Sequence, residues 1–240
     1  MPSETLRGIV LRVANYRDHD RMLTLLTPDR GRVDVLSRGC RRPKSCLLCA
    51  SESFMQGEFV VFRTQDRYTL TSCTVSESYY PVRLDATRMT CGAYMLQLAQ
   101  AAAHPGQEAE TLYELLTDAL HRLCYGDNEN PLTIVSAYLL LFAAVGGYRP
   151  RLSHCVYCEK EIAPGQGAGF DSIEGGICCR SCAKGALMRL SGEQLTWMRE
   201  TLQTGFDLPP APDHVNLFEI LRRYVESRLE TTIPSSRFLP

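Results

Sequence analysis

The sequence predicts an α+β protein, with a small β-barrel over residues 1–80 followed by an α-helical domain over residues 81–240. Three observations lead to this division. Short apolar runs with a strand-like period fill the first part, the period becomes helical after Pro81, and two Cys-x-x-Cys pairs interrupt the helical part. These pairs place a small cysteine-rich insert at about residues 150–185.

About five short strands are expected in the barrel, separated by polar turns, of which Pro28 to Gly31 is the clearest. The strands are expected at Leu6–Val13, Met22–Thr27, Arg32–Ser37, Gly57–Thr64 and Arg67–Ser76. Closing a barrel removes the edges that such short strands would otherwise expose. The OB-fold is the common solution at this size, and we expect it here.

Five helices are expected after the barrel, at about residues 85–103, 109–123, 131–145, 191–203 and 215–230. Three of them have recognisable N-terminal signals. Asp85 is a cap for the first, Asn130 followed by Pro131 begins the third, and Ser191 with Gln194 forms a capping box for the fourth. The third helix is apolar nearly all round, which is typical of the central helix of a bundle.

The two cysteine pairs predict a zinc ribbon. Cys155-x-x-Cys158 and Cys179-x-x-Cys182 have the spacing of a tetrahedral four-thiolate site, in which each pair supplies two ligands from one tight turn. Four sulfurs leave no open position for water, so the expected Zn²⁺ ion is structural rather than catalytic. Cys178 is an alternative to Cys179, because its spacing from Cys182 is also workable, and Cys179 is preferred.

The charge distribution points to a phosphate-binding loop. The net charge of −1 alone indicates no nucleic-acid partner, but residues 1–80 carry twelve Lys/Arg against nine Asp/Glu. Six basic residues fall within fifteen positions opposed only by Asp34, namely Arg30, Arg32, Arg38, Arg41, Arg42 and Lys44. Such a focused basic segment predicts DNA binding, and a merely solvated basic loop is the alternative.

Other reactive residue types are better explained structurally. Asp18, His19 and Asp20 resemble catalytic material, but they lie in a turn between two arginines, where ion pairing and turn formation explain them more simply. No phosphate-binding glycine motif, zincin helix or nucleophile elbow occurs in the sequence.

A third Cys-x-x-Cys lies in the basic segment, at Cys46 and Cys49, with Cys40 nearby. It lacks a locally paired fourth metal ligand, and it lacks the helix start that a thioredoxin-like redox site needs. Incidental thiols are therefore the preferred interpretation. His154, beside the first zinc pair, is a less favoured substitute for one cysteine ligand.

The eleven cysteines, in a chain without an apolar signal segment near Met1, favour a reducing compartment. The longest apolar run, around Ala137 to Val145, is too short to span a bilayer. We therefore expect a cytoplasmic protein with no membrane partner.

Several motifs, taken in order, resemble the bacterial RecO family of DNA repair proteins. They are the Tyr16-x-Asp18-x-Asp20 turn, the basic signature at residues 37–45, the approach to the first cysteine pair at residues 146–152, and the ending at residues 236–239. The resemblance covers essentially the whole length. The chain departs from that family where Ser37-Arg38 replaces the usual Ala-Lys, and where a cysteine-rich stretch replaces basic or polar residues after Ser45.

The resemblance implies a recombination mediator, not an enzyme, associated with the bacterial nucleoid. Members of the family bind single- and double-stranded DNA, anneal complementary strands, and work with RecR and RecF to load RecA onto strands coated by the single-stranded-DNA-binding protein. It also implies that the helical domain binds the C-terminal tail of that coating protein, with Arg222, Arg223 and Arg228 as candidate rim charges.

Two other functions stay open at this point. One is a zinc-ribbon adaptor that binds only proteins, in which the basic loop has no role. The other is a nuclease that uses Asp18, Asp20 and a divalent metal.

Overall fold

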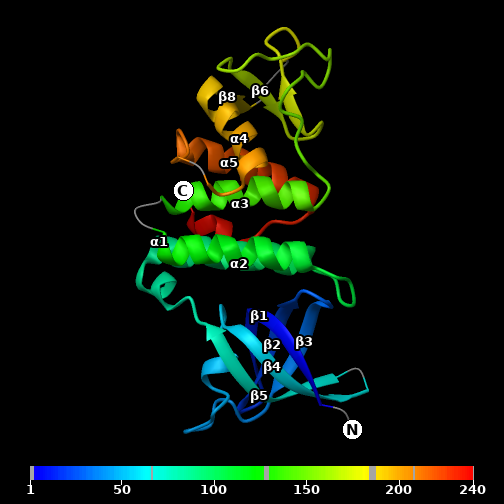
Figure 1. The fold of residues 1–240 in the computed structure, drawn as a ribbon, viewed down its shortest axis with the longest axis vertical. Helices are drawn as coiled ribbons and strands as arrows, with labels where there is room; N and C mark the ends of the chain where they lie inside the picture. The colour runs from blue at the N-terminus through cyan, green and yellow to red at the C-terminus, as the bar shows by residue number, and fades with distance from the viewer. Residues whose placement is uncertain (1–2, 66, 127–129, 184–187, 208, 240) are drawn as a thin grey trace. The chain divides into compact units, whose positions relative to one another are not determined.

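A computed structural model describes residues 3–65, 67–126, 130–183, 188–207 and 209–239. The chain divides into two compact units, residues 1–120 and 121–240. The first unit holds the strands of the barrel, and it continues through helix α1 (Ala86–Ala102) into helix α2 (Glu110–Tyr125) (Figure 1). Three short 3-10 helices complete the chain: η1 (Cys49–Ser51), η2 (Tyr80–Leu84) and η3 (Pro234–Phe238).

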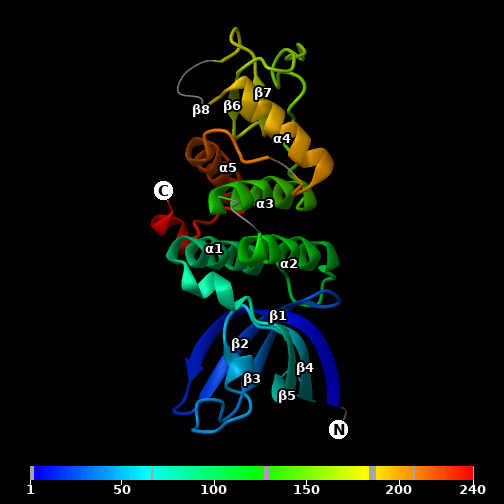
Figure 2. The ribbon, with the colours of Figure 1, turned by 60° about the vertical axis from the view of Figure 1, so that its left-hand side comes forward.

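Five strands form a closed barrel in the order β1-β2-β3-β5-β4. They are β1 (Ser3–Tyr16), β2 (Asp20–Thr27), β3 (Gly31–Ser37), β4 (Gln56–Thr64) and β5 (Arg67–Glu77). The β3–β5 pair is parallel, and the other neighbours are antiparallel. The long β1 pairs with both β4 and β2, and its register with β2 shifts between Val10 and Arg12 (Figure 2). A shift of this kind bends a strand, which lets β1 close the barrel. The predicted OB-fold barrel is confirmed.

Strand β1 is longer at both ends than the apolar run Leu6–Val13 that predicted it. Asn15 pairs with Arg21 and Tyr16 with Asp20, so the turn before β2 is shorter than expected. The cause is that these outer residues carry exposed or half-exposed polar side chains, which an alternation of apolar residues cannot reveal.

The barrel interior follows from the two-residue period of its strands. In β3, Val33 and Val35 are buried, whereas Asp34 between them is exposed. The core also includes Phe59 and Cys40, both fully buried. Each fully buried Val, Leu or Phe contributes roughly 1.5–3 kcal/mol relative to an exposed one, which is what fixes the register of the strands.

The turn between β2 and β3 is locked to the loop between α1 and α2. Gly31 has a φ of 61°, and an added Cβ would lie 2.3 Å from the backbone oxygen of His104. Backbone hydrogen bonds run from Arg32 N to His104 O (3.3 Å), from Gly106 N to Arg30 O (2.9 Å), and from Ala109 N to Pro28 O (2.7 Å). The glycine therefore permits a backbone contact that no other residue allows.

The second unit is built around α3 (Pro131–Val145), which packs against α4 (Gly192–Thr204) and α5 (His214–Arg228) (Figure 2). The Asn130 side chain accepts the Leu132 N–H at 2.9 Å, and the Ser191/Gln194 capping box is present. Residues 132–140 of α3 are all buried, as expected for a central helix. The predicted caps are thus confirmed at the starts of α3 and α4.

Between α3 and α4 lies a small three-stranded sheet in the order β7-β6-β8. Its strands are β6 (Ala168–Asp171), β7 (Gly176–Cys178) and β8 (Met188–Leu190). Among the residues that the structure describes, no helix has the length and apolar character needed to cross a membrane.

Candidate functional site

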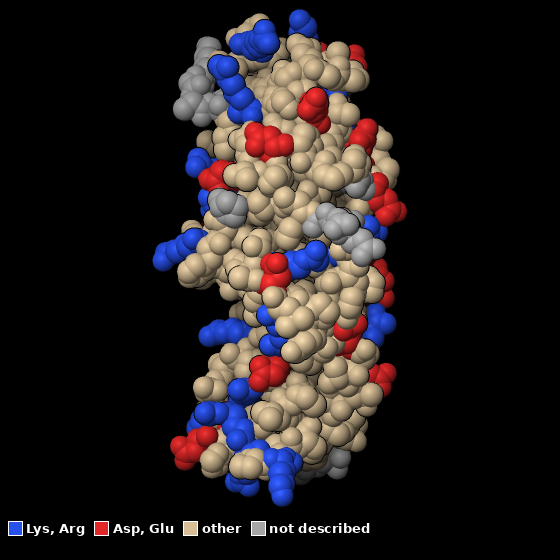
Figure 3. Space-filling view, turned by 90° about the vertical axis from the view of Figure 1, so that its left-hand side faces the viewer, with Lys and Arg blue, Asp and Glu red and all other residues tan. Residues whose placement is uncertain are grey.

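The loop that follows β3 carries four exposed cations. Arg38, Arg41, Arg42 and Lys44 all have exposed side chains, and within the described part of the chain none of them forms an ion pair. We call these four residues the basic loop. Figure 3 shows Lys and Arg side chains gathered at the lower end of the barrel unit. An unopposed group of cations is a surface to which a polyanion is attracted.

The β1–β2 turn holds the basic loop in place. The Asp20 carboxylate accepts the Gly39 N–H at 2.7 Å, and His19 O accepts the Arg41 N–H at 3.0 Å. Cys40, between them, is fully buried in the barrel core. A hydrogen bond to a charged group stabilises by about 1.5–3 kcal/mol. In the sequence, Asp20 lies beside residue types that are common in active sites. In the structure, its carboxylate instead holds the backbone of the basic loop at Gly39.

The other two predicted DNA-binding residues lie elsewhere. Arg30 donates to the Glu4 carboxylate (2.7 Å) and to the Tyr68 hydroxyl (3.0 Å). The hydrogen bond to Glu4 raises the pKa of Arg30, against the opposing effect of burial. Arg32 donates to the backbone oxygen of Gln100 at 3.5 Å. Arg30 precedes β3 and Arg38 follows it, so the two lie at opposite ends of a strand that is roughly 20 Å long at the rise of a β-strand.

Two residues outside the six predicted DNA-binding residues, Tyr16 and Arg17, lie where the β1–β2 turn meets the basic loop. Tyr16 is 40% exposed, and the Arg17 guanidinium lies 5.2 Å from the centre of its ring. Arg41 Nη1 donates to Asp18 O at 3.3 Å, which links this turn to the basic loop. For Arg17 the signal in the sequence is its place directly before the aspartate turn, where local ion pairing is the simpler explanation.

Four cysteine sulfurs meet in the second unit. The Sγ atoms of Cys155, Cys158, Cys179 and Cys182 all lie within 4.8 Å of one another, and those of Cys158 and Cys179 are 3.7 Å apart. Tetrahedral Zn–S bonds of about 2.3 Å require sulfurs about 3.8 Å apart, so the donor set fits such an ion. Cys178 is buried in β7 and is not part of this group.

Without a cation these sulfurs compete for protons. Burial opposes ionisation of Cys155, but N–H groups of Cys179, Tyr157 and Cys158 outweigh it and lower the pKa of Cys155 to about 6. Hydrogen bonds with Cys158 and Cys179 instead raise the pKa of Cys182 to about 12. A bound dication would hold all four as thiolates, and its four sulfur ligands would leave no open position for catalysis.

The remaining cysteines of the first unit do not form a comparable group. Cys46 and Cys49 are exposed, and Cys49 Sγ lies 3.9 Å from Cys46 O. Within the described ranges, the four-sulfur group is the sole cluster of three or more metal-ligand residue types close enough to share an ion. Asp18 and Asp20 are not in such a cluster.

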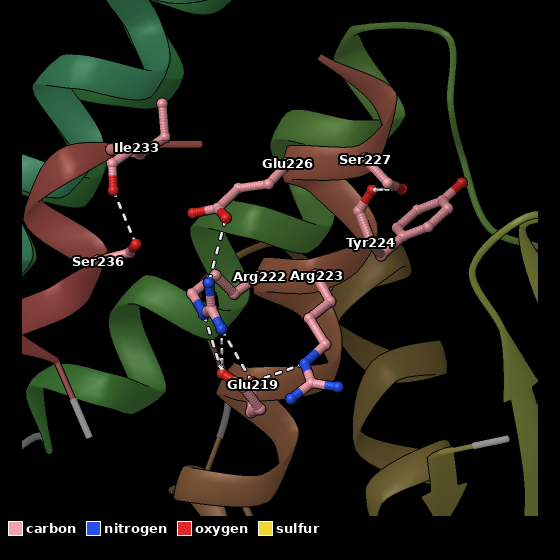
Figure 4. Close-up of polar contacts among 8 residues, drawn as sticks. All are labelled: Glu219, Arg222, Arg223, Tyr224, Glu226, Ser227, Ile233 and Ser236. Carbon is pink, nitrogen blue, oxygen red and sulfur yellow. Dashed lines mark hydrogen bonds and ion pairs between the residues drawn. The ribbon is translucent and has the colours of Figure 1, made fainter. Parts of the chain in front are cut away.

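The three arginines suggested as rim charges for a tail-binding pocket are engaged on α5. Arg222 bridges Glu219 (2.7 Å) and Glu226 (3.1 Å), and Arg223 pairs with Glu219 (2.6 Å) (Figure 4). Burial of Glu219 opposes its ionisation, but the two arginines outweigh it and lower its pKa. Arg228 donates to Ile173 O at 2.7 Å. Carboxylates thus neutralise two of the three charges.

The fold and these sites define a class of protein: an OB-fold barrel with an exposed basic loop, joined to a helical unit that carries a four-cysteine cluster of the structural-metal type. Comparison with known proteins gives the family. The model of the recombination protein O N-terminal domain matches residues 1–79, and that of its C-terminal domain matches residues 83–237. The chain belongs to the RecO family of DNA repair proteins.

Individual relatives support the same assignment. The chain is 29% identical over 239 residues to the DNA repair protein RecO of Acetivibrio thermocellus, covering 97% of this chain and 94% of that one. It is 33% identical over 200 residues to that of Symbiobacterium thermophilum, covering 81% and 78%. It is 36% identical over 183 residues to that of Streptomyces avermitilis, covering 73% and 72%.

Proposed function

We propose that this protein is a recombination mediator that binds single- and double-stranded DNA through the basic loop and anneals complementary strands. The observation that carries the proposal is the group Arg38, Arg41, Arg42 and Lys44, whose side chains are exposed and form no ion pair in the described part of the chain. The Asp20 carboxylate holds the backbone of this loop at Gly39. Residues 1–80 would supply this activity, and residues 81–240, with the insert at about 150–185, would supply the protein contacts.

The mechanism is electrostatic. Each cation that neutralises a phosphate releases condensed counterions, so affinity falls as salt rises and does not depend on base sequence. Two strands held on one basic surface lose much of their mutual repulsion, and pairing then proceeds without nucleotide hydrolysis. Tyr16, with Arg17 against its ring, offers an unpaired base a surface for stacking. No bond is made or broken in this scheme, so the protein acts as a mediator and not as an enzyme.

The metal in this proposal is one structural Zn²⁺ held by Cys155, Cys158, Cys179 and Cys182. Its contribution is to cross-link the two turns of the insert, whose strands β6, β7 and β8 are only four, three and three residues long. The partners in this proposal are RecR, with RecF, for loading RecA, and the C-terminal tail of the single-stranded-DNA-binding protein, bound by residues 81–240.

The test is annealing of complementary oligonucleotides coated with the single-stranded-DNA-binding protein, measured across a salt series. The test variant replaces Arg38, Arg41, Arg42 and Lys44 with alanine, and Arg12→Ala/Arg67→Ala removes exposed charges from the barrel as a control. The four contacts should account for about 2.8 of the log–log salt slope on single strands, at about 0.7 per phosphate. The test variant should therefore lose this slope together with annealing, and the control should keep both.

Annealing by the test variant at the wild-type rate and with the wild-type salt slope would contradict the proposal. A wild-type protein that anneals at no salt concentration would favour the second candidate, a zinc-ribbon adaptor that binds only proteins. The exposed Cys158 turn is the observation that supports this candidate, because it presents backbone and side chains to a partner.

A further inference from the structure

A second group of cations lines an open groove in the helical unit. The groove lies between the segment that follows α3 and the last turns of α4, and we call it the α4 groove. Its polar lining consists of Arg149, Arg151, Ser153, His154, Arg199 and Gln203. No Asp or Glu is among the described residues that line it.

The protein backbone fixes two of the three guanidinium groups. Arg199 is half-buried, and it donates from Nε to Leu152 O at 2.8 Å and from Nη2 to Ile162 O at 2.7 Å. Arg149 donates from Nη2 to Leu202 O at 3.2 Å. These hydrogen bonds hold the two guanidinium groups in place before a ligand binds, which reduces the side-chain entropy lost on binding.

The third guanidinium is unengaged. Arg151 is exposed, and its side chain has no hydrogen-bond or ion-pair partner in the described ranges of the chain. Its backbone is held on both sides, since its N–H donates to Gly175 O (2.9 Å) and its oxygen accepts from Ile177 (3.0 Å). The fold thus brings three positive charges to one groove without a carboxylate to offset their repulsion, and a bound polyanion would relieve it.

The chemistry of the groove favours a phosphodiester chain over an acidic peptide. Guanidinium forks match phosphate oxygens, and the serine hydroxyl and glutamine amide add neutral donors. The groove is open, and its apolar lining is confined to Pro150, Leu152 and Leu202. A peptide with large apolar side chains needs a deeper apolar pocket to bury them. A strand that lies along an open groove with exposed bases needs only phosphate contacts.

We infer that the α4 groove is a second binding site for the backbone of single-stranded nucleic acid, separate from the basic loop. The inference rests on the proposed function and extends it, because annealing requires two strands and a second site gives the protein a contact for each. In this site the Arg151 side chain is free to contact phosphate, because it holds no other part of the described chain. Arg149 and Arg199 contact phosphate with guanidinium groups that backbone oxygens already hold in place.

The test uses the full-length protein and a fluorescein-labelled single-stranded thymidine oligonucleotide, with anisotropy measured across a salt series. The groove variant is Arg149→Glu/Arg151→Glu. The control is Arg189→Glu/Arg237→Glu, which changes the same charge at two exposed arginines of the same unit outside the groove. Metal content and thermal melting check that both variants fold, and Arg151→Glu alone replaces the double variant if that one does not.

Loss of two phosphate contacts should make the log–log salt slope shallower by about 1.4, and it should lower affinity in 0.1 M salt by on the order of 25-fold. The control should bind like the wild type. Groove and control variants with equal affinity and equal slope would overturn the inference. So would a groove variant that binds the oligonucleotide normally but loses an acidic peptide, because the groove would then be a peptide site.

The basic-loop variant, measured in parallel, keeps this inference distinct from the proposed function. If neutralising the basic loop changes nothing while the groove variant loses affinity, the DNA-binding role of the loop fails and the α4 groove stands. If only the loop variant loses affinity, the proposed function stands and the groove inference is overturned.

Discussion

Replacement of Gly31 by alanine tests whether the lock between the β2–β3 turn and the α1–α2 loop stabilises the first unit. The added Cβ would lie 2.3 Å from His104 O and 2.6 Å from Gln107 O, closer than any real Cβ contact, so backbone must move. The three backbone hydrogen bonds of the lock would lengthen. The positive φ of 61° adds strain for any residue with a Cβ.

Gly106→Ala is the matched control. Gly106 lies in the same lock with a φ of 76°, but an added Cβ there meets nothing within 4 Å. Gly106→Ala should lower the free energy of unfolding by about 1 kcal/mol. This is the backbone strain of a left-handed residue with a Cβ, partly offset because alanine reduces the conformational entropy of the unfolded chain. Gly31→Ala adds the weakening of two or three hydrogen bonds, for a total of about 3 kcal/mol.

Urea unfolding followed by far-UV circular dichroism measures the two free energies. The single tryptophan, Trp197, belongs to the other unit, so its fluorescence is not a substitute. Hydrogen exchange at the amides of Arg32, Gly106 and Ala109 should rise in Gly31→Ala well above its level in Gly106→Ala. If the two variants lose equal stability, the close approach of Gly31 to the α1–α2 loop does not stabilise the unit.

Two further outcomes concern the second unit. Cys179→Ser should reduce bound zinc and lower the melting temperature of the unit, whereas Cys178→Ser should keep a full equivalent of zinc, because Cys178 lies outside the four-sulfur group. Metal analysis after purification decides this, and the reverse pattern would assign the ligand to Cys178. Glu219→Gln should destabilise the unit at pH 7 by up to about 1 kcal/mol, since its partners Arg222 and Arg223 are partly exposed. The pKa of Glu219 is lowered in the folded state, so its contribution is present above the unfolded pKa of about 4.3 and is lost as pH falls through the folded value. Denaturation curves of wild type and variant should therefore converge at low pH, and a difference that persists below pH 3 would refute the ion-pair explanation.

Much of the fold was accessible from local sequence. The starts of α1, α3 and α4 follow from Asp85, Asn130 and Ser191, because a capping side chain bonds to an N–H only two or three residues away. The barrel strands follow from a two-residue alternation, and the cysteine cluster follows from two short spacings. Each of these signals lies within a few neighbouring residues, and a single chain displays it without an aligned family.

Tertiary structure alone decided how the charges are used. Composition grouped Arg30 with Arg38, but the length of β3 places them at opposite ends, and Glu4 from another strand neutralises Arg30. The hydrogen bond from Gly39 N–H to the Asp20 carboxylate joins the two ends of the complete β2–β3 hairpin. Arg199 and Arg151 line the same groove only because the insert packs back against α4, where Arg199 donates to Leu152 O. A side chain acts as a phosphate contact or as an ion-pair partner according to its neighbours in space, and those neighbours are distant in sequence.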